Sequence, residues 1–395
     1  MKTFDEALAY LLKQATITLK TDTIHITQAL GKTLAEDIVS KINVPPHDNS
    51  MMDGYALNLS DLQKTNTFIV SQRIAAGEQG SELEKGTLAR IFTGAAIPQG
   101  VNAVIMQEET EQVLDQIKIT AKTTRGGQNI RLKGEDIAIN AVILKKGHLL
   151  KAQDLGLITS IGISKVKIYQ PLTIATFTTG SELLEPSEPP QQGKIYNANR
   201  YILAGAIPQL GFKLIDLGVI NDTLTNTIQA MEKAASMADI VITTGGVSVG
   251  EEDHIKPAIE QVGKLDMWKV KMKPGKPIAY GNINDTPFIG LPGNPVSAFA
   301  TFNLFAKPYL LKMQGQIKCV PEPMWLTANF STTKTNFRRD FARAKLVNNQ
   351  QETSVELYPN QGSGVLSSTV WADGFVVIPE ETIINKGDKV AFYQF

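Results

Sequence analysis

Apolar residues recur at helical spacing near the start of the chain. Over residues 3–19 they fall on one face of a predicted helix, and a second, shorter helix is predicted over residues 27–34. From about residue 44 the pattern changes to short apolar runs separated by Gly, Asn and Pro, which predicts strands as far as residue 135. A helical start is therefore followed by a mostly β insert.

Strands and helices alternate in the second half of the chain. Beyond residue 171 this alternation predicts an open sheet of parallel strands, and after residue 319 short alternating strands are typical of a small β-barrel. Residues before and after the β insert are expected to pack together as one discontinuous unit. The predicted fold class is thus a multidomain α/β protein: an open α/β sheet domain, a β insert, a discontinuous mixed unit and a C-terminal β-barrel. The predicted domains are 1–45 with 136–169, 46–135, 170–318 and 319–395.

Charge and cysteine content narrow the class of protein. Lys and Arg number 39 and Asp and Glu number 39, so the chain lacks the strong positive charge of a general nucleic-acid binder. A single cysteine, Cys319, cannot form an internal disulfide or a cysteine-rich zinc site. No stretch approaches the ~18 apolar residues of a membrane helix, and the acidic start argues against a signal peptide. A cytoplasmic protein is expected, with neither nucleic acid nor membrane as a partner.

Three loops that follow apolar strands carry glycine together with hydroxyl or amide groups. Loops at the carboxyl ends of parallel strands meet at one edge of a sheet, where ligands bind. Glycine lets backbone N–H groups approach an anion, so phosphate recognition is predicted, although glycine after a strand is also an ordinary turn former. None of the loops is a Walker A or a dinucleotide fingerprint. The loops span 178–182, 244–253 and 291–297, with the candidate binding residues Gly245, Gly246, Ser248, Pro292, Gly293, Asn294 and Ser297.

Lysines and acids supply the candidate charges. Alternation in a single strand would place Lys269, Lys271 and Lys273 on one face, where with Lys276 they would clamp phosphate or another oxyanion. A solvated face is the more common reading of such a run. Carboxylates beside turns hold Mg²⁺ that bridges to phosphate oxygens, although one acid in a loop is usually a cap. The acids in question are Asp53, Asp136, Glu182, Asp222 and Asp253.

Residues 48–56 read D-N-S-M-M-D-G-Y-A and resemble the signature of molybdopterin molybdenumtransferases, a family that includes the E domain of gephyrin. Further motifs follow in the family's order, so that the resemblance spans nearly the whole chain. One departure is Ser181, where many relatives carry Asp; the missing charge would weaken cation binding. The further motifs lie at 93–98, 130–136, 179–183, 245–253, 273–277 and 291–297.

The resemblance implies an elongated homodimer of four-domain subunits. Its active site would lie between the α/β domain of one subunit and the β insert of the other. The implied reaction inserts molybdenum from molybdate into adenylylated molybdopterin and releases AMP, assisted by Mg²⁺ or Zn²⁺, with Asp53 or Asp222 transferring protons. Matching positions imply Asp53, Glu182, Asp222 and Asp253 as catalytic residues, the last three also as metal ligands, and Thr93, Arg131, Asp136, Lys269, Lys273 and Ser363 as substrate-binding residues.

Two alternatives to this function stay open. Molybdopterin adenylyltransferases share a similar α/β domain, but the β insert favours the transferase, and an assay of ATP-dependent adenylylation separates the two. A scaffold that binds partner peptides at the dimer or barrel surface, as the E domain of gephyrin does with receptors, is a different class of protein. An adenylyltransferase and acceptor molybdoenzymes are expected partners. Neither the preferred cation nor the choice of molybdenum over tungsten follows from the sequence.

Overall fold

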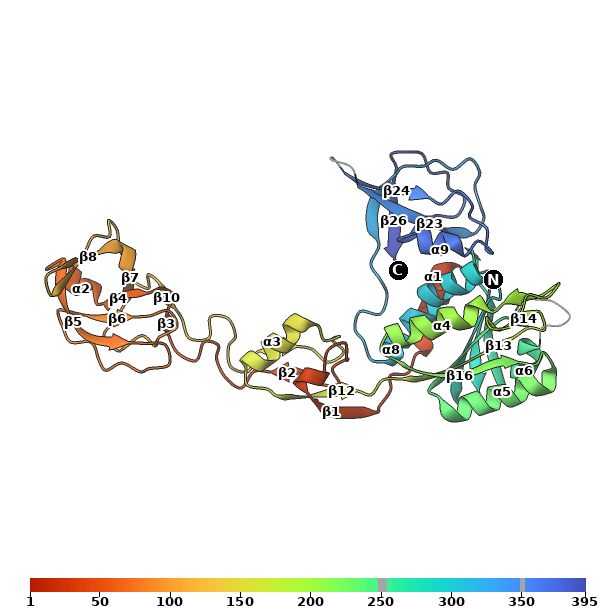
Figure 1. Ribbon diagram of the computed structural model, residues 1–395, viewed down its shortest axis with the longest axis horizontal. Coiled ribbons are helices and arrows are strands. Elements are labelled where there is room, and N and C mark those ends of the chain that lie inside the picture. Colours follow the sequence, from red (N-terminus) through yellow and green to blue (C-terminus); the bar gives the residue numbers. More distant parts are fainter. Residues whose placement is uncertain (248–253, 349–351) are drawn as a thin grey trace.

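The computed structural model describes residues 1–247, 254–348 and 352–395 of an elongated chain. Figure 1 shows a β insert at one end, a small middle unit, and an α/β unit with a β-barrel beside it at the other end. This arrangement confirms the predicted fold class. No helix in these ranges is both long and apolar enough to cross a bilayer.

The α/β unit is built on a six-stranded sheet in the order β16-β13-β17-β21-β20-β18. The first four strands are parallel neighbours, whereas β20 and β18 run antiparallel at one side. The carboxyl ends of the four parallel strands therefore meet at one edge. The strands are β13 (Thr173–Thr179), β16 (Lys213–Ile220), β17 (Ile240–Thr244), β18 (Gly263–Lys269), β20 (Pro277–Ile283) and β21 (Thr286–Leu291).

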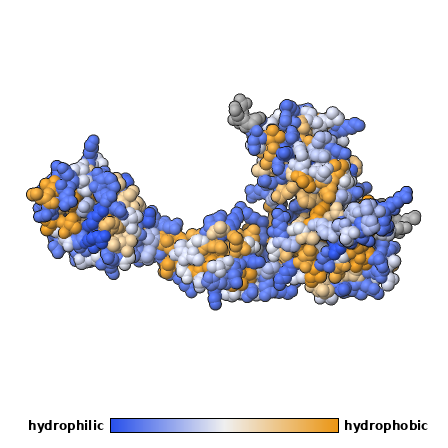
Figure 2. Space-filling view, in the orientation of Figure 1, coloured by the Kyte–Doolittle hydropathy of each residue, from blue (hydrophilic) through white to orange (hydrophobic). Residues whose placement is uncertain are grey.

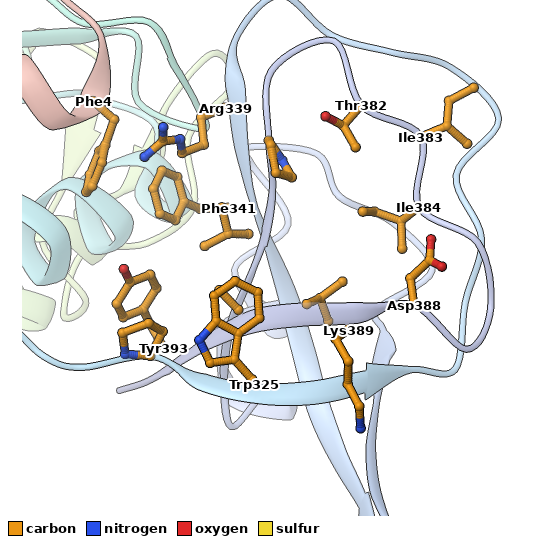
Figure 3. Close-up of a pocket in the computed structure, with 15 residues that line it drawn as sticks. Phe4, Trp325, Arg339, Phe341, Thr382, Ile383, Ile384, Asp388, Lys389 and Tyr393 are labelled. Carbon is orange, nitrogen blue, oxygen red and sulfur yellow. The ribbon is translucent and has the colours of Figure 1, made fainter.

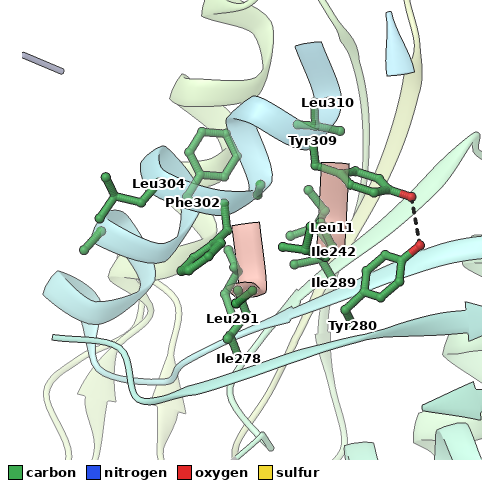
Figure 4. Packing of buried hydrophobic residues seen from close by; sticks show 14 of the residues in the cluster. Leu11, Ile242, Ile278, Tyr280, Ile289, Leu291, Phe302, Leu304, Tyr309 and Leu310 are labelled. Atoms are coloured by element: carbon green, nitrogen blue, oxygen red, sulfur yellow. Dashed lines mark hydrogen bonds between the residues drawn. The ribbon is translucent and has the colours of Figure 1, made fainter. Parts of the chain in front are cut away.

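Helices cover both faces of this sheet, because alternate side chains of each strand point to opposite faces. Ile174 packs in a cluster with α4, α7 and α8, while its neighbour Ala175 packs in a second cluster with α5 and α6. Figure 4 shows the first cluster, in which the hydroxyls of Tyr280 and Tyr309 lie 3.2 Å apart. The helices are α4 (Ala198–Gln209), α5 (Leu224–Met237), α6 (Ile255–Val262), α7 (Pro295–Thr301) and α8 (Lys307–Met313), with a π-helical turn at Phe302–Ala306.

Helix α1 (Phe4–Gln14) also belongs to the first cluster. Phe4 lies 5.0 Å from Phe305 between ring centroids, and Leu11 is fully buried in the same core. The helix begins at a capping box in which Thr3 and Glu6 bond each other's backbone N–H groups. The sequence prediction had grouped this helix with the discontinuous unit. Helical periodicity identified its apolar face but carried no information about the element that covers it.

Segments from before and after the insert share the core of the middle unit. β1 pairs with β12 and β2 pairs with β11, both antiparallel. The helix predicted over 27–34 is wrong: only the 3₁₀ turn Ile26–Gln28 forms there. The elements are β1 (Thr21–His25), β2 (Ile38–Val39), β11 (Val142–Leu144), α3 (Ala152–Ser160) and β12 (Lys165–Tyr169).

The β insert contains a six-stranded sheet in the order β7-β4-β6-β5-β9-β8 and a separate short pair, β3 with β10. Two small clusters of buried side chains form its core. The elements are β3 (Asn49–Ser50), β4 (Gly54–Leu57), α2 (Leu59–Leu62), β5 (Thr67–Ile74), β6 (Thr87–Ile91), β7 (Ala103–Met106), a 3₁₀ turn at Gln107–Glu109, β8 (Thr110–Val113), β9 (Gln116–Ile119) and β10 (Ile130–Arg131).

Five strands close the C-terminal barrel, because β23 pairs with both β24 and β25. A sixth strand, β19 (Met272–Lys273), comes from the α/β unit and pairs with β23. The barrel is thus joined to the α/β unit by backbone pairing. Its elements are β22 (Met324–Ala328), β23 (Arg339–Asn348), β24 (Thr353–Leu357), α9 (Ser367–Trp371), β25 (Gly374–Ile378) and β26 (Lys389–Gln394).

Candidate functional site

Loops from the four parallel strands line one cleft of about 470 Å³. The Gly245 N–H donates to the Leu291 carbonyl at 3.1 Å, and the Asn199 amide donates to the Gly293 carbonyl at 2.7 Å. Ser248 and Asp253 lie outside the described residues. Of the residues proposed from the sequence, the cleft brings together Glu182, Asp222, Gly245, Gly246, Pro292, Gly293, Asn294 and Ser297.

Close packing of the loops requires the two adjacent glycines. Gly245 has a φ of 85° and Gly246 a φ of 63°, in the left-handed region that residues other than glycine rarely adopt. A Cβ on Gly245 would lie 2.8 Å from the backbone oxygen of Thr179. Since that backbone cannot move without shifting β13, the loop after β17 fits against the loop after β13 only with glycine at this position.

Two carboxylates, those of Glu182 and Asp222, line the cleft. Mg²⁺ is commonly held by one or two carboxylates together with substrate phosphates and water, whereas Zn²⁺ favours nitrogen or sulfur ligands. Within residues 1–247, 254–348 and 352–395, no group of three His, Cys, Asp or Glu side chains is placed to hold a metal. The two carboxylates of the cleft are a donor set that fits Mg²⁺.

The lysine-rich segment is not one strand, so the prediction that Lys269, Lys271 and Lys273 share a strand face is wrong. Lys269 ends β18, which pairs with β20, whereas Lys273 lies in β19, which pairs with the barrel strand β23. The Lys273 ammonium forms a 2.7 Å ion pair with Asp340 of the barrel. Lys276 is exposed, and the segment contributes Pro277 to the cleft lining. Lys273 thus joins two units through its side chain as well as its backbone.

A barrel loop reaches the edge of the cleft through Ser363. The Ser363 carbonyl accepts a hydrogen bond from the Val296 N–H at 3.1 Å, directly after the Pro-Gly-Asn-Pro turn. The loop is held by Arg343, which is fully buried and donates to the Gly362 carbonyl at 3.0 Å. Sequence reasoning missed Arg343. Strand alternation offered a signal, because Arg343 shares with Phe341 the buried face of β23 that points away from the barrel core, whereas Ala342 and Ala344 point into that core.

The four remaining candidates lie in or next to the β insert. Asp53 Oδ1 accepts hydrogen bonds from the Thr93 N–H at 2.8 Å and from the Thr93 hydroxyl at 2.7 Å. These bonds stabilise the carboxylate and hold the pKa of Asp53 below its ordinary value. Arg131 and Asp136 are exposed. Figure 1 shows the insert strands β3, β4 and β10 far from β13 of the α/β unit, so one chain does not bring its two sets of candidates together.

A second cavity, of about 550 Å³, lies between α1 and the barrel. Phe4, Phe341, Trp325 and Tyr393 line it, as Figure 3 shows. Arg339 lies at its side, paired with Asp5 through two 2.8 Å hydrogen bonds. None of the residues that line this largely apolar cavity was a candidate from the sequence, and it lacks the glycine loops and paired acids of the cleft.

Three family models cover most of the chain. The MoeA N-terminal region (domain I and II) matches residues 2–162, a probable molybdopterin binding domain matches 175–312, and the MoeA C-terminal region (domain IV) matches 326–395. The class is thus a multidomain protein organised around an α/β domain of the molybdopterin-binding type, and the cleft lies in that domain. The chain belongs to the molybdopterin molybdenumtransferase (MoeA) family.

Relatives of known name match this chain over all or most of its length. It is 39% identical to a molybdopterin molybdenumtransferase of Haemophilus influenzae, over 100% of this chain and 99% of the relative. It is 33% identical to one of Staphylococcus aureus, over 90% and 87% of the two chains. The molybdopterin biosynthesis MoeA protein of Pyrococcus horikoshii OT3 superposes with a TM-score of 0.87 at 30% identity, covering 100% of both chains.

Proposed function

We propose that this enzyme inserts molybdenum from molybdate into adenylylated molybdopterin with release of AMP, a step of molybdenum cofactor biosynthesis. The observation that carries the proposal is the cleft at the carboxyl edge of the sheet, where glycine loops and two carboxylates meet. A pterin nucleotide supplies phosphates for the loops. Full-length identity of 39% to a molybdopterin molybdenumtransferase supports the same reaction.

The residues of the cleft divide the work by their chemistry. The glycine loops bind the phosphates through backbone N–H groups. Glu182 and Asp222 would hold Mg²⁺, with Asp253 as a third candidate from the sequence, and the cation would polarise the pyrophosphate from which AMP leaves. Lys269 and Lys276 are proposed to neutralise substrate oxygens, since their ammonium groups are strong hydrogen-bond donors to oxyanions.

Asp53 suits a binding role better than a proton-transfer role. Its lowered pKa means that the carboxylate is fully ionised near neutral pH and accepts protons weakly. We therefore assign Asp53 to orienting a donor or cation at the molybdate. Thr93, Arg131 and Asp136 complete this second group of residues, with Arg131 neutralising the oxyanion.

We propose that the site is assembled from two subunits. The cleft and the insert candidates lie at opposite ends of the chain, so a second copy must bring an insert to the cleft (Figure 1). Exposed apolar side chains lie next to the insert candidates: Met52 is 41% exposed beside Asp53, and Leu132 is 57% exposed beside Arg131. Figure 2 shows further hydrophobic side chains on the middle unit. A homodimer would cover them.

Subunit complementation tests both proposals. Asp53→Asn damages the insert and Glu182→Gln damages the cleft, so each variant alone should lose molybdate-dependent AMP release. In a mixed dimer the insert of the Glu182→Gln chain and the cleft of the Asp53→Asn chain form one intact site. Statistical mixing of such symmetric dimers should restore about a quarter of wild-type activity. No recovery from mixed dimers whose formation is verified by two different tags would contradict the two-subunit site.

A scaffold function is the second candidate, and the cavity beside Trp325 is the observation that favours it. Its aromatic lining suits an apolar peptide side chain from a partner. Retention of a partner by wild type but not by Trp325→Ala, with AMP release unchanged, would establish scaffolding beside catalysis.

For the reaction itself we place the enzyme in the cytoplasm, between an adenylyltransferase that supplies its substrate and molybdoenzymes that take its product.

A further inference from the structure

A small recess of about 80 Å³ adjoins the cleft. Its walls come from the ends of β13 and β17, the first turn of α4, and two short strands, β14 (Leu183–Leu184) and β15 (Ile195–Tyr196). Glu182 and Thr179 line both the recess and the cleft. A ligand that occupies the cleft therefore has direct access to the recess.

The recess has apolar walls on the side of β14 and β15. Leu183, Ile195 and Tyr196 contribute them, and Pro295 faces the recess from the start of α7. Apolar walls suit the faces of a planar ring. The pair β14 and β15 is only two residues long in each strand, so few backbone hydrogen bonds resist a small outward movement when a ring enters.

Two buried polar atoms on the recess have no hydrogen-bond partner in the part of the chain that the structure describes. They are Oγ1 of Thr179, a residue 4% exposed, and Oδ1 of Asn199, a residue 9% exposed. The orientation of the Asn199 amide is fixed, because its Nδ2 donates to the Gly293 carbonyl at 2.7 Å. Oδ1 is therefore an acceptor, and Glu182 adds a carboxylate acceptor on the same recess.

Buried polar groups without partners cost free energy, and folded proteins contain few of them. A retained pair on the wall of a ligand pocket is explained if the ligand completes the hydrogen bonds. Acceptors at Asn199 and Glu182 need a donor on the ligand, an N–H or an O–H group, and the apolar walls beside them favour an N–H carried by a flat ring. A carbonyl edge would instead bring oxygen against Oδ1 of Asn199 and be repelled.

We infer that the recess is a subsite for the amino-bearing edge of a heteroaromatic ring. The ring faces lie against Ile195 and Tyr196, the exocyclic amine donates to Asn199 Oδ1 or Glu182, and the Thr179 hydroxyl bonds a neighbouring ring nitrogen. This inference rests on the proposed function, because the substrate carries two such rings, the aminopyrimidinone of the pterin and the adenine of the nucleotide. The recess would thus select the substrate by its amine while the cleft binds its phosphates.

Three neighbouring threonines offer matched variants. Thr178 Oγ1 accepts a 2.8 Å hydrogen bond from Asn197, so Thr178→Val should lower thermal stability. Thr179 and Thr243 are both buried with Oγ1 atoms that lack a partner among the described residues, but only Thr179 lines the recess. Thr179→Val and Thr243→Val should therefore both retain or raise the melting temperature, and only Thr179→Val should weaken ligand binding.

Binding is measured by calorimetry on the full-length chain with two pairs of probes. AMP is compared with inosine monophosphate, and pterin with lumazine, so each pair differs by replacement of an amine by an oxygen. We expect the wild type to prefer the amine in one pair by roughly tenfold, the worth of one good hydrogen bond. The pair in which the amine is preferred shows whether the recess binds the adenine or the pterin ring. Thr179→Val should bind that probe less tightly, and Thr243→Val should equal wild type.

Equal affinity of the wild type for both members of both pairs would overturn the subsite, as would equal binding by the Thr179→Val and Thr243→Val proteins. AMP release from adenylylated molybdopterin is measured on the same proteins. If the wild type prefers the amine but releases no AMP, the subsite proposal holds and the proposed reaction is wrong. If the wild type releases AMP but shows no preference for the amine, the proposed reaction holds and the subsite proposal is wrong.

Discussion

The cleft of the α/β unit and the insert group around Asp53 differ in how completely one chain builds them. Four parallel strands bring the cleft loops together, and buried threonines and fixed glycines hold their positions. Asp53 and Thr93 bond each other, while Arg131 and Asp136 are exposed, and none of these four residues lines the cavity of about 700 Å³ in the insert. The cleft is thus formed within one chain, whereas the insert group consists of three charged side chains and one threonine.

This difference indicates a division of roles between the two ends of the molecule. A preformed cleft suits a large substrate that must be held by many contacts. The charged residues of the insert, by contrast, suit contact with a substrate that is already bound in the cleft, when the insert approaches from the open side. Substitutions that affect one end alone can therefore test whether the two ends act on one reaction.

Asp222→Ala should have the largest effect. Removal of a carboxylate from the cleft should lower molybdate-dependent AMP release by about 100-fold or more, because charge stabilisation at the reacting phosphate is lost. The assay follows AMP from adenylylated molybdopterin at several Mg²⁺ concentrations. Asp285→Ala is the matched control, since Asp285 lies in the turn between β20 and β21 at the opposite edge of the sheet. Equal losses in both variants would remove Asp222 from the site.

Lys273→Met should lower the free energy of unfolding by about 1–3 kcal/mol, because Asp340, which is 8% exposed, would lose its ion-pair partner. Denaturant titration measures this change. Adding Asp340→Asn removes the stranded charge and should recover most of the stability. If AMP release recovers with stability in the double variant, Lys273 is structural; if activity stays low, Lys273 also acts on the substrate, and the cleft extends to the barrel.

Thr93→Val should shift the titration of Asp53. The hydrogen bonds from Thr93 lower the pKa of Asp53, so the carboxylate keeps its charge until the pH falls through that lowered value. Loss of the hydroxyl should raise the pKa part of the way toward its ordinary value, because the hydrogen bond from the Thr93 N–H remains. Carbon-13 NMR of the Asp53 carboxyl measures the shift. Thr93→Ser keeps the hydroxyl and should leave the titration in place; an equal shift in that variant would contradict this account.

Ser181→Asp should have the smallest effect. An added carboxylate beside Glu182 should lower the Mg²⁺ concentration for half-maximal activity by about threefold, since exposed charges interact weakly in water. Ser187→Asp adds the same charge farther along the exposed loop and should change little. An increase in the Mg²⁺ requirement of Ser181→Asp would show that the cleft does not bind a cation near this position.

Much of the α/β unit could be predicted from the sequence, because its strands and loops are marked by patterns within short segments of the chain. Parallel strands bury both faces, so their apolar runs are continuous and are followed by visible glycine loops, as at Gly245 and Gly293. The convergence of these loops follows from strand direction alone. Thr179 and Asn199 were missed as possible ligand contacts because their significance lies in a missing hydrogen-bond partner, which appears only when neighbouring segments are placed.

Long-range pairing explains what could not be predicted. The lysine run follows an alternating pattern, but Lys273 leaves the sheet of the α/β unit to pair with β23 of the barrel, nearly 70 positions later in the chain. The Arg343 contact joins β23 to the loop around Ser363, with 19 positions between Arg343 and Gly362. Both arrangements are set by which surfaces meet, and short-range periodicity does not encode that choice.

The packing of α1 also affects the order of assembly during synthesis. Phe4 is made about 300 residues before its partner Phe305, a delay of roughly 15–60 s at ordinary translation rates. The middle unit and the insert are complete before that partner exists. The apolar face of α1 must therefore wait unburied, and the α/β unit closes only when α8 emerges. Helix α1 is thus made well before most of the core that it joins.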